Sequence, residues 1–406
     1  MEEIGRKYLA LALHLDRHFE GVVDAYFGPE ELKAEVQAGE PRSLELLARD
    51  ARELQESIQG LDCDAQRKDY LTRQARAMAA IARNLAGEKM HYLEEVELYF
   101  DLTPEMVGES IFEAVHAEID ELLPGKGSLL ERLQAWERGL EVQPDRLLSV
   151  FERASEEARR RTVGLFDLPS GEEVTWELVK DKPWRAYNRY RGQYRSGIEV
   201  NTDLPVHMHR VLEAVAHEAY PGHHTEGAMK EHRLYRQEGR AEHAIHVLGP
   251  EAVLAEGIAV NAWGVVFSDS ELVAFQRDVL CPLAGVPGDD AERQVAISGA
   301  MDGLRGVTSN AALLLHRDGN SPEKVGQYVE RYGMGTQADV AQTMEFIQIP
   351  LWRSYAFNYS IGRELVAPLL EGPDRVANFA RLLSEPFTPT QVRQWVADLV
   401  SSQDTT

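Results

Sequence analysis

The sequence predicts a mainly α-helical fold with one small antiparallel β-sheet. Apolar residues recur at helical spacing through the first 165 residues, and this spacing returns after Pro205 and continues to the end of the chain. Between about Glu173 and Asn201, apolar and polar residues alternate instead, as they do in strands. We therefore expect an N-terminal helical region over 1–165 and a second region over 166–406, which form two domains or one continuous domain.

The composition is typical of soluble globular proteins: of 406 residues, 44% are hydrophobic and 27% are charged. The 43 basic and 67 acidic residues give a net charge of −24. This charge repels phosphate backbones and anionic lipid surfaces, so we expect neither a nucleic acid nor a membrane as partner. Two cysteines are too few for a disulfide framework, and Met1–Glu3 does not begin a secretory signal. These features predict a cytoplasmic protein and leave its oligomeric state open.

The first predicted helix contains apolar residues from Ile4 to Phe19 and runs to Asp24, because Gly28-Pro29 is the turn signal that stops it. Thr103 followed by Pro104 is typical of a helix start, with the threonine as N-cap and the proline at the first helical position. Further helices are predicted over residues 44–58, 70–85 and 145–165.

Three segments form the predicted sheet, namely residues 174–178, 186–194 and 197–200. Gly192 and Gly197 separate the last two, which favours an antiparallel hairpin. The strand over 197–201 is either an edge that pairs with an extended peptide or simply one strand of a hairpin. After Pro205 the sequence predicts helices again, with one beginning at Gly249-Pro250.

The most informative segment reads His-Glu-Ala-Tyr-Pro-Gly-His-His and spans His217 to His224. It resembles the His-Glu-x-x-His motif of zinc hydrolases with two residues inserted. In the uninterrupted motif, two histidines four residues apart lie on one helical face and bind one zinc ion at about 2.0–2.1 Å. The glutamate beside the first histidine, here Glu218, is the base that accepts a proton from the attacking water.

Proline at position 221 must end or kink the helix, because it lacks an N–H and clashes with the preceding turn. Gly222 then permits an unusual backbone conformation. If Pro221 and Gly222 form a two-residue bulge, His223 takes the place of the second ligand. On an unbroken helix His224 would be aligned with His217, but about 10.5 Å further along the axis. We therefore assign His217 and His223 as metal ligands, with His224 as the alternative to His223 or as a group that faces the substrate.

A catalytic zinc ion generally has three protein ligands and one open position, so a third ligand is expected from another helix. Glu256 is the best candidate, because it lies inside a predicted helix beside Gly257, which would let a neighbouring helix approach closely. Glu226, Glu242 and Glu251 compete, but each lies nearer a helix end or a solvated face. The competing interpretation is a capped helix end with packed histidines and no metal, which explains the adjacent glutamates poorly.

The same segment is similar to the signature of a bacterial family known as domain of unknown function 885, regarded as gluzincin-type zinc metallohydrolases. The resemblance covers about residues 187–362. The chain departs from the family pattern at Thr225-Glu226 and over 258–263, and these departures concern the specificity of the pocket more than the metal site. Further matches are Val200-Asn201-Thr202, Glu256-Gly257-Ile258-Ala259, Pro350, Tyr359 and Ile361-Gly362, and more loosely Val23 to Pro29. The resemblance implies a multi-helix gluzincin-type architecture with the sheet beside an active-site cleft, and hydrolase chemistry without a defined substrate.

Together these features predict a zinc (Zn²⁺) metallopeptidase whose metal site lies within 166–406 and whose substrate is a peptide or small amide. Glu218 is the predicted base. The oxyanion needs a donor besides the metal, and the resemblance points to Tyr359, with Tyr355 one turn earlier as the rival. Both tyrosines fit a packed core equally well.

Asn201, Arg353 and Tyr355 are the candidate substrate-binding residues. Arg353 has the planar fork that binds a substrate carboxylate, although a surface salt bridge would use the same group. Two other functions remain open: a zinc hydrolase of a non-peptide amide or an ester, and a non-catalytic metal-binding protein on a peptidase scaffold. Glu218 discriminates the last of these, because a scaffold without catalysis has no need for a carboxylate there.

Overall fold

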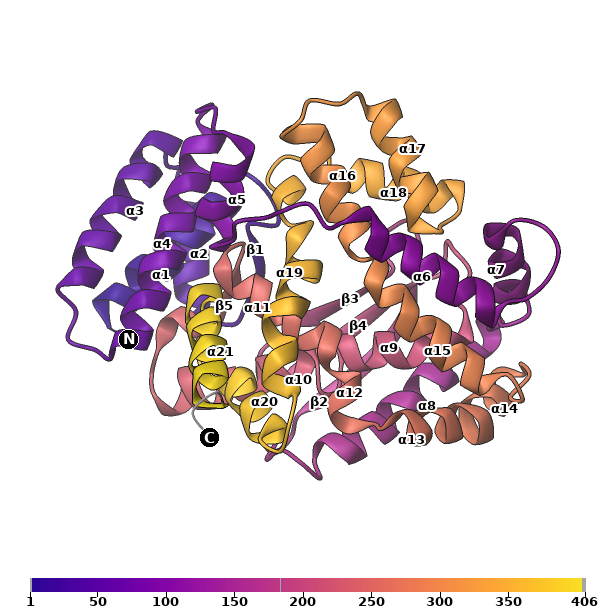
Figure 1. Ribbon diagram of the computed structural model, residues 1–406. Coiled ribbons are helices and arrows are strands. Elements are labelled where there is room, and N and C mark those ends of the chain that lie inside the picture. The colour runs from indigo at the N-terminus through magenta and orange to yellow at the C-terminus, as the bar shows by residue number, and fades with distance from the viewer. Residues whose placement is uncertain (1, 183, 404–406) are drawn as a thin grey trace.

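The computed structural model describes residues 2–182 and 184–403 and shows a mainly helical protein (Figure 1). The predicted fold class is therefore confirmed at this level. The helices before the larger sheet are α1 (Glu3–Asp16), α2 (Glu30–Ala38), α3 (Leu44–Gln59), α4 (Ala65–Leu85), α5 (Tyr92–Phe100), α6 (Glu109–Leu122), α7 (Leu129–Arg138) and α8 (Pro144–Thr162). The helices after it are α9 (Met208–Glu218), α10 (His223–Lys230), α11 (Pro250–Asn261), α12 (Trp263–Val266), α13 (Asp269–Phe275), α14 (Cys281–Ala284), α15 (Ala291–Met301), α16 (Gly306–His316), α17 (Pro322–Gly333), α18 (Gln337–Phe346), α19 (Phe357–Val366), α20 (Arg375–Ser384) and α21 (Pro389–Gln403).

The first helix is shorter than predicted, because α1 ends at Asp16 and does not run to Asp24. The Asp16 carboxylate accepts hydrogen bonds from the backbone N–H groups of Gly21 (3.1 Å) and Val23 (3.0 Å), and so turns the chain. Gly21 has φ +98°, a conformation that suits glycine. The chain then enters the short strand β1 (Val23–Tyr26).

The predicted helix start at Thr103-Pro104 is also wrong. Helix α5 ends at Phe100, and α6 begins at Glu109. The side chain of Asn310 accepts from the N–H of Val107 (2.9 Å) and donates to its carbonyl (2.8 Å). These bonds satisfy the backbone in a non-helical conformation, so a contact from a distant helix overrides the local capping signal.

The larger sheet contains β2 (Glu173–Val179), β3 (Ala186–Tyr190) and β4 (Arg195–Asn201) in the order β2-β4-β3. Strand β4 pairs antiparallel with β3 but parallel with β2, so the predicted antiparallel sheet is in fact mixed. The hairpin of β3 and β4 adds to β2 with β4 on the inside. Since β4 has a partner on both sides, the alternative of an open edge over 197–201 is wrong.

A second, two-stranded sheet joins distant parts of the chain. Strand β1 pairs antiparallel with β5 (Ile245–Val247), which lies between α10 and α11. This pairing brings the start of the chain to the segment that carries the predicted metal ligands.

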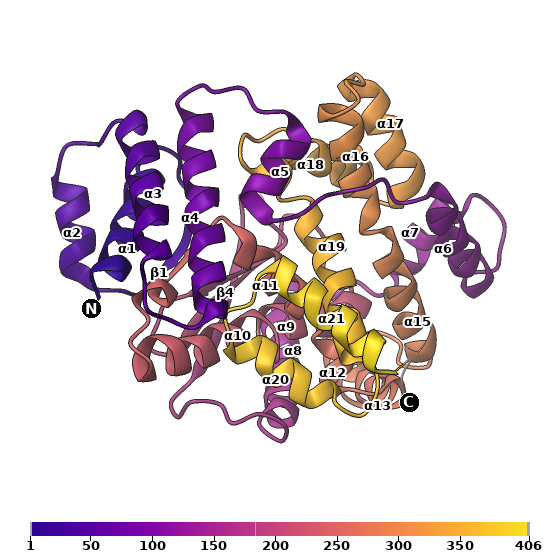
Figure 2. The same ribbon diagram turned by 60° about the vertical axis from the view of Figure 1, so that its left-hand side comes forward.

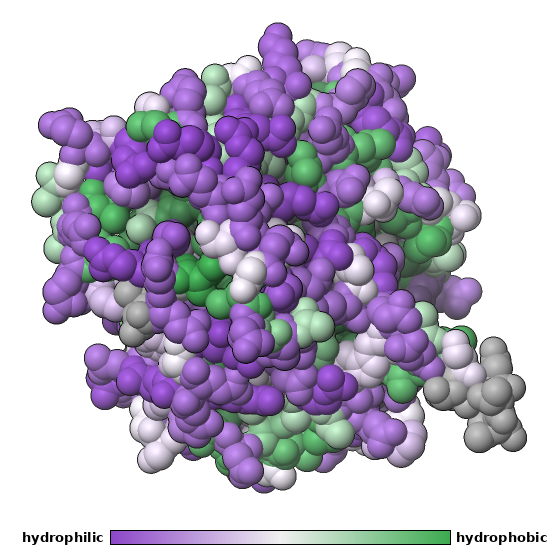
Figure 3. Space-filling model, turned by 90° about the vertical axis from the view of Figure 1, so that its left-hand side faces the viewer, coloured by the Kyte–Doolittle hydropathy of each residue, from purple (hydrophilic) through white to green (hydrophobic). Residues whose placement is uncertain are grey.

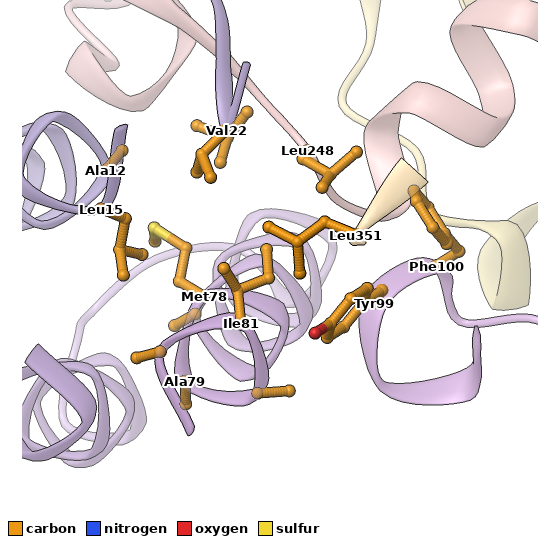
Figure 4. Close-up of a cluster of buried hydrophobic side chains, with 14 of the residues drawn as sticks. Ala12, Leu15, Val22, Met78, Ala79, Ile81, Tyr99, Phe100, Leu248 and Leu351 are labelled. Atoms are coloured by element: carbon orange, nitrogen blue, oxygen red, sulfur yellow. The ribbon is translucent and has the colours of Figure 1, made fainter. Parts of the chain in front are cut away.

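The N-terminal helices share a hydrophobic core with segments from the second half of the chain. Met78 and Ile81 of α4 pack with Leu248, which follows β5, and with Leu351, which precedes α19 (Figure 4). On the face that carries the N-terminal helices, hydrophilic side chains predominate and apolar groups are scattered (Figure 3). Among the described residues, no helix is long and apolar enough to cross a membrane.

Helices α11 and α19 touch backbone to backbone. A Cβ on Gly257 would lie 2.6 Å from the carbonyl carbon of Gly362, and a Cβ on Gly362 would lie 3.0 Å from the nitrogen of Gly257. Glycine at 257 therefore allows the close helix approach that the sequence predicts. The C-terminal helix α21 packs against both helices (Figure 2).

Candidate metal centre

The turn between α9 and α10 contains the two-residue bulge. The N–H of Gly222 donates to the carbonyl of Ala216 (2.9 Å), and the N–H of Thr225 donates to the carbonyl of Ala219 (3.3 Å). Both bonds span six residues, whereas an α-helical bond spans four. The extra two residues are accommodated in the turn, and His223 is the first residue of the next helix.

Glycine is required at position 222 because the chain folds back onto the end of α9. A Cβ there would overlap the carbonyl oxygens of Ala216 and His217 and would lie 2.7 Å from the carbonyl carbon of His217. Real Cβ atoms essentially never approach heavy atoms closer than 3.0 Å. Gly222, which directly precedes the second predicted ligand, His223, therefore has no room for a side chain.

The structure brings His217, His223 and Glu256 together, and we call these three residues the candidate metal centre. One ligand atom from each lies within 4.8 Å of the others. Glu256 Oε2 is 3.4 Å from Nε2 of His217 and 3.9 Å from Nε2 of His223. The two imidazole rings are nearly perpendicular, at 88°, with centroids 4.7 Å apart.

One atom of the candidate metal centre lacks a partner. Among residues 2–182 and 184–403, no donor forms a hydrogen bond to the buried Oε2 of Glu256, and Nε2 of His217 lies 3.4 Å away; its Oε1 accepts a hydrogen bond from the hydroxyl of Tyr355 (2.8 Å). A buried carboxylate oxygen without a donor is costly unless a cation or another donor satisfies it. The histidine side chains are 17% and 21% exposed, so a small ion or water can reach them.

The alternative ligands lie elsewhere. His224 is fully buried, and its ring nitrogens contact Ser196 Oγ and Glu172 Oε2, both at 2.9 Å. Of the competing carboxylates, Glu226 and Glu251 bind Nζ of Lys230 at 2.7 and 3.0 Å, and Glu242 binds Nε of Arg67 at 2.7 Å.

Burial and neighbouring charges set the protonation of the site. Burial raises the pKa of Glu218 to about 7, with the Glu256 and Asp24 carboxylates adding to the rise and His217 opposing it. Burial, with help from His217, lowers the pKa of His223 to about 4, so this imidazole is neutral at pH 7, the form that binds metals. Burial alone would lower the pKa of His217, but the nearby carboxylates of Glu256 and Glu218 favour the imidazolium and raise this pKa overall.

Two tyrosines lie at the candidate metal centre. The ring of Tyr359 stacks on that of His217, with centroids 6.5 Å apart at 23°, and Tyr355 holds Glu256 as described above. Burial, followed by the charge of Glu256, raises the pKa of both phenols well above the ordinary value. Both therefore remain protonated near neutral pH and can donate hydrogen bonds.

The other two predicted substrate-binding residues are engaged with the protein itself. Nδ2 of Asn201 donates to the carbonyls of Lys182 (2.8 Å) and Trp184 (3.0 Å), which holds the connection that precedes β3. Arg353 pairs with the fully buried Glu95 through Nε (3.0 Å) and Nη2. Of the two interpretations of Arg353, the structure therefore shows a salt bridge.

Two residues beside the site were missed by the sequence analysis. Asn188 of β3 donates through Nδ2 to the backbone carbonyl of Glu218 (2.6 Å) and so fixes the end of α9. Asp24 of β1 accepts a hydrogen bond from the hydroxyl of Tyr187, the residue that precedes Asn188. No spacing in the sequence signals these contacts, although Asp24 lies in the segment that matches the family loosely.

No described protein family and no curated protein matches this chain. A solved structure of a "putative lipoprotein" from Colwellia psychrerythraea is similar over 91% of this chain and 70% of its own, with 15% sequence identity and a TM-score of 0.54. A "putative lipoprotein of unknown function" from Shewanella oneidensis is similar over 94% of this chain and 77% of its own, with 13% identity and a TM-score of 0.50. At these identities the likeness concerns the fold alone.

Proposed function

We propose that this protein is a zinc-dependent peptidase with a gluzincin-type arrangement of its ligands. The observation that carries the proposal is the convergence of two histidine nitrogens and a buried, unpartnered carboxylate oxygen beside a second glutamate, Glu218. Two imidazoles and one carboxylate are the donor set of many catalytic zinc sites. The residues present therefore fit zinc, with His217, His223 and Glu256 as its ligands.

Zinc bound there would supply a Lewis acid that polarises a carbonyl and lowers the pKa of water. Glu218 follows His217 directly and acts as the base, taking a proton from the attacking water and passing it to the leaving amine. Tyr359 donates a hydrogen bond to the oxyanion that develops on the substrate. Tyr355 orients Glu256, and Asn188 fixes the end of the helix that carries Glu218.

Two other functions use the same residues. A zinc hydrolase of a non-peptide amide or an ester would need the same base and metal ligands, so only substrates distinguish it. A non-catalytic metal-binding protein would not need Glu218. The buried position of this carboxylate, with its pKa raised to about 7, is more useful to a base than to a scaffold and favours catalysis.

The test combines metal analysis with a peptide-library digest on the same protein. Glu218→Gln keeps the size of the side chain but cannot accept a proton. We expect this variant to retain about one zinc ion per chain and to lose roughly 10²–10⁴-fold in turnover. Glu177→Gln, which changes an exposed carboxylate on β2, is the matched control. A zinc-loaded Glu218→Gln protein with full activity would exclude the mechanism, and a protein that binds no zinc would exclude the proposed function.

A further inference from the structure

The side chain of Glu172 joins the two sides of the turn between α9 and α10. Glu172 directly precedes β2, and its side chain is only 1% exposed. Its Oε2 accepts a hydrogen bond from the hydroxyl of Tyr220 and lies 2.9 Å from Nε2 of His224. Tyr220 comes directly before the segment Pro221-Gly222-His223, and His224 comes directly after it. One carboxylate oxygen therefore bridges the segment that contains the predicted ligand His223.

Further contacts attach this carboxylate and His224 to the rest of the protein. Arg159, in the last turn of α8, donates from Nε to Oε1 of Glu172 (2.6 Å). Ser196, on the central strand β4, meets Nδ1 of His224 (2.9 Å). Burial alone would raise the pKa of Glu172, but the hydrogen bonds from His224, Tyr220 and Arg159 lower it to about 2. The carboxylate is therefore charged at neutral pH, and charged acceptors form the stronger hydrogen bonds.

A serine, a histidine and a carboxylate joined in this order are also the arrangement of hydrolases that use a serine nucleophile. Ser196 is only 3% exposed and His224 is fully buried, so a substrate cannot reach the serine hydroxyl. The network of Ser196, His224 and Glu172 therefore holds the turn in place and does not form a second active site.

The turn needs such support, because its backbone hydrogen bonds are few and long. The bond from the N–H of Thr225 to the carbonyl of Ala219 measures 3.3 Å, longer than the usual length of about 2.9–3.0 Å. Metal–ligand distances tolerate deviations of only about 0.2 Å. A ligand on this turn is held to that tolerance only if side chains around it fix the backbone.

We propose that Glu172 is a positioning residue of the candidate metal centre. It fixes the turn through Tyr220 and His224, and so holds His223 where it can bind the same ion as the other two ligands. This inference rests on the proposed function for the identity of the ion. It adds to that function a residue that acts through the backbone of the turn and not through the substrate.

Two variants interrupt the bridge to different extents. Tyr220→Phe removes one hydroxyl and keeps the ring, whereas Glu172→Ala removes the carboxylate from both sides of the turn. Glu242→Ala is the matched control, because Glu242 is also a fully buried carboxylate paired with an arginine, Arg67 (2.7 Å), but lies outside the turn. Competition with a chelator measures the zinc affinity of each protein. Hydrogen–deuterium exchange of the metal-free proteins measures how well the backbone of residues 219–226 is protected.

We expect Tyr220→Phe and Glu172→Ala each to weaken zinc binding by about 10–100-fold, the range for lost supporting contacts, and to speed exchange over 219–226. Excess zinc should restore about one ion per chain in both variants, because the ligands themselves remain. Since Tyr220 acts through Glu172, the double variant should bind zinc no more weakly than Glu172→Ala alone. Glu242→Ala should lower the melting temperature and leave zinc affinity unchanged.

Unchanged zinc affinity in Tyr220→Phe would overturn the inference, and this variant decides the matter if Glu172→Ala does not fold. An equal loss of affinity in Glu242→Ala would also overturn it, because general destabilisation would then explain the effect. Failure of the proposed function is recognised separately. If the zinc-loaded protein cleaves no peptide, that function fails and the zinc affinities still decide the role of Glu172. If the unaltered protein binds no zinc, exchange over 219–226 decides it: faster exchange in Tyr220→Phe supports the hold on the turn, and unchanged exchange excludes it.

Discussion

Substitution of Gly222 by alanine tests whether the tight turn sets the geometry of the candidate metal centre. The new Cβ would overlap the carbonyl oxygens of Ala216 and His217 and would lie 2.7 Å from the carbonyl carbon of His217, whereas ordinary contact begins at 3.4 Å, so the chain must move by more than about 0.7 Å. Metal–ligand distances tolerate only about 0.2 Å. Because Gly222 lies between His217 and His223, the shift separates the two ligands directly. We expect zinc affinity to fall by more than the roughly 10–100-fold typical of lost supporting contacts.

The global fold should respond much less, because overpacking at one turn costs about 1–3 kcal/mol in free energy of unfolding. Gly326→Ala is the matched control: Gly326 lies within α17, where an added Cβ meets nothing within 4 Å. That variant should retain zinc and gain about 0.4–1 kcal/mol. Elemental analysis after dialysis, a chelator titration and a denaturant melt measure these quantities. A Gly222→Ala protein with normal zinc affinity would refute the idea that this turn positions the ligands.

Further substitutions separate metal binding, catalysis and stability. His223→Ala should lose its zinc, whereas His224→Ala should keep it. The His224→Ala protein should melt at a lower temperature, because two buried hydrogen bonds are lost. If elemental analysis showed more zinc in His223→Ala than in His224→Ala, His224 would be the ligand instead. Tyr359→Phe should lower kcat by about 10²–10³-fold at unchanged zinc content, as measured by steady-state kinetics. Tyr355→Phe should mainly weaken zinc binding, by about 10–100-fold, as measured by metal titration. If the two variants showed the opposite effects, the roles assigned to the two tyrosines would be wrong. Lys230→Met leaves two buried carboxylates without their cation and should cost about 3–5 kcal/mol in free energy of unfolding, so an unchanged denaturant midpoint would show that this network contributes little.

The geometry of the candidate metal centre could be predicted because most of it is local. His217 and His223 belong to one short segment, and the effects of proline and glycine on a helix indicate which histidine follows the bulge. Glu256 lies on a different helix, but Gly257 beside it signals the close helix contact that the structure shows. In both cases the properties of neighbouring residues in the sequence were sufficient to predict the position of the ligand.

Features that depend on distant partners could not be predicted in this way. The predicted first helix includes Asp24, yet this residue lies in a strand because the segment Ile245–Val247 pairs with its neighbours Val23, Ala25 and Tyr26. The segment after α5 has a capping signal, but Asn310 from a later helix holds it in a non-helical conformation. Likewise, no spacing reveals that the fork of Arg353 is occupied by the buried carboxylate of Glu95. In each of these cases a contact with a distant part of the chain, which the local sequence pattern does not reveal, decides the structure.

The core shared by α4 and the later segments has a consequence for how the chain is made. Met78 and Ile81 leave the ribosome long before Leu351, which covers them in the native protein. At about 5–20 residues per second, synthesis of the intervening chain takes roughly 15–50 s. During that time the N-terminal helices cover only part of the apolar face of α4, and the part that packs with Leu248 and Leu351 in the native protein is open to premature association with other chains. We therefore expect the nascent protein to depend on chaperones that shield this face until the segment around Leu351 has been synthesised.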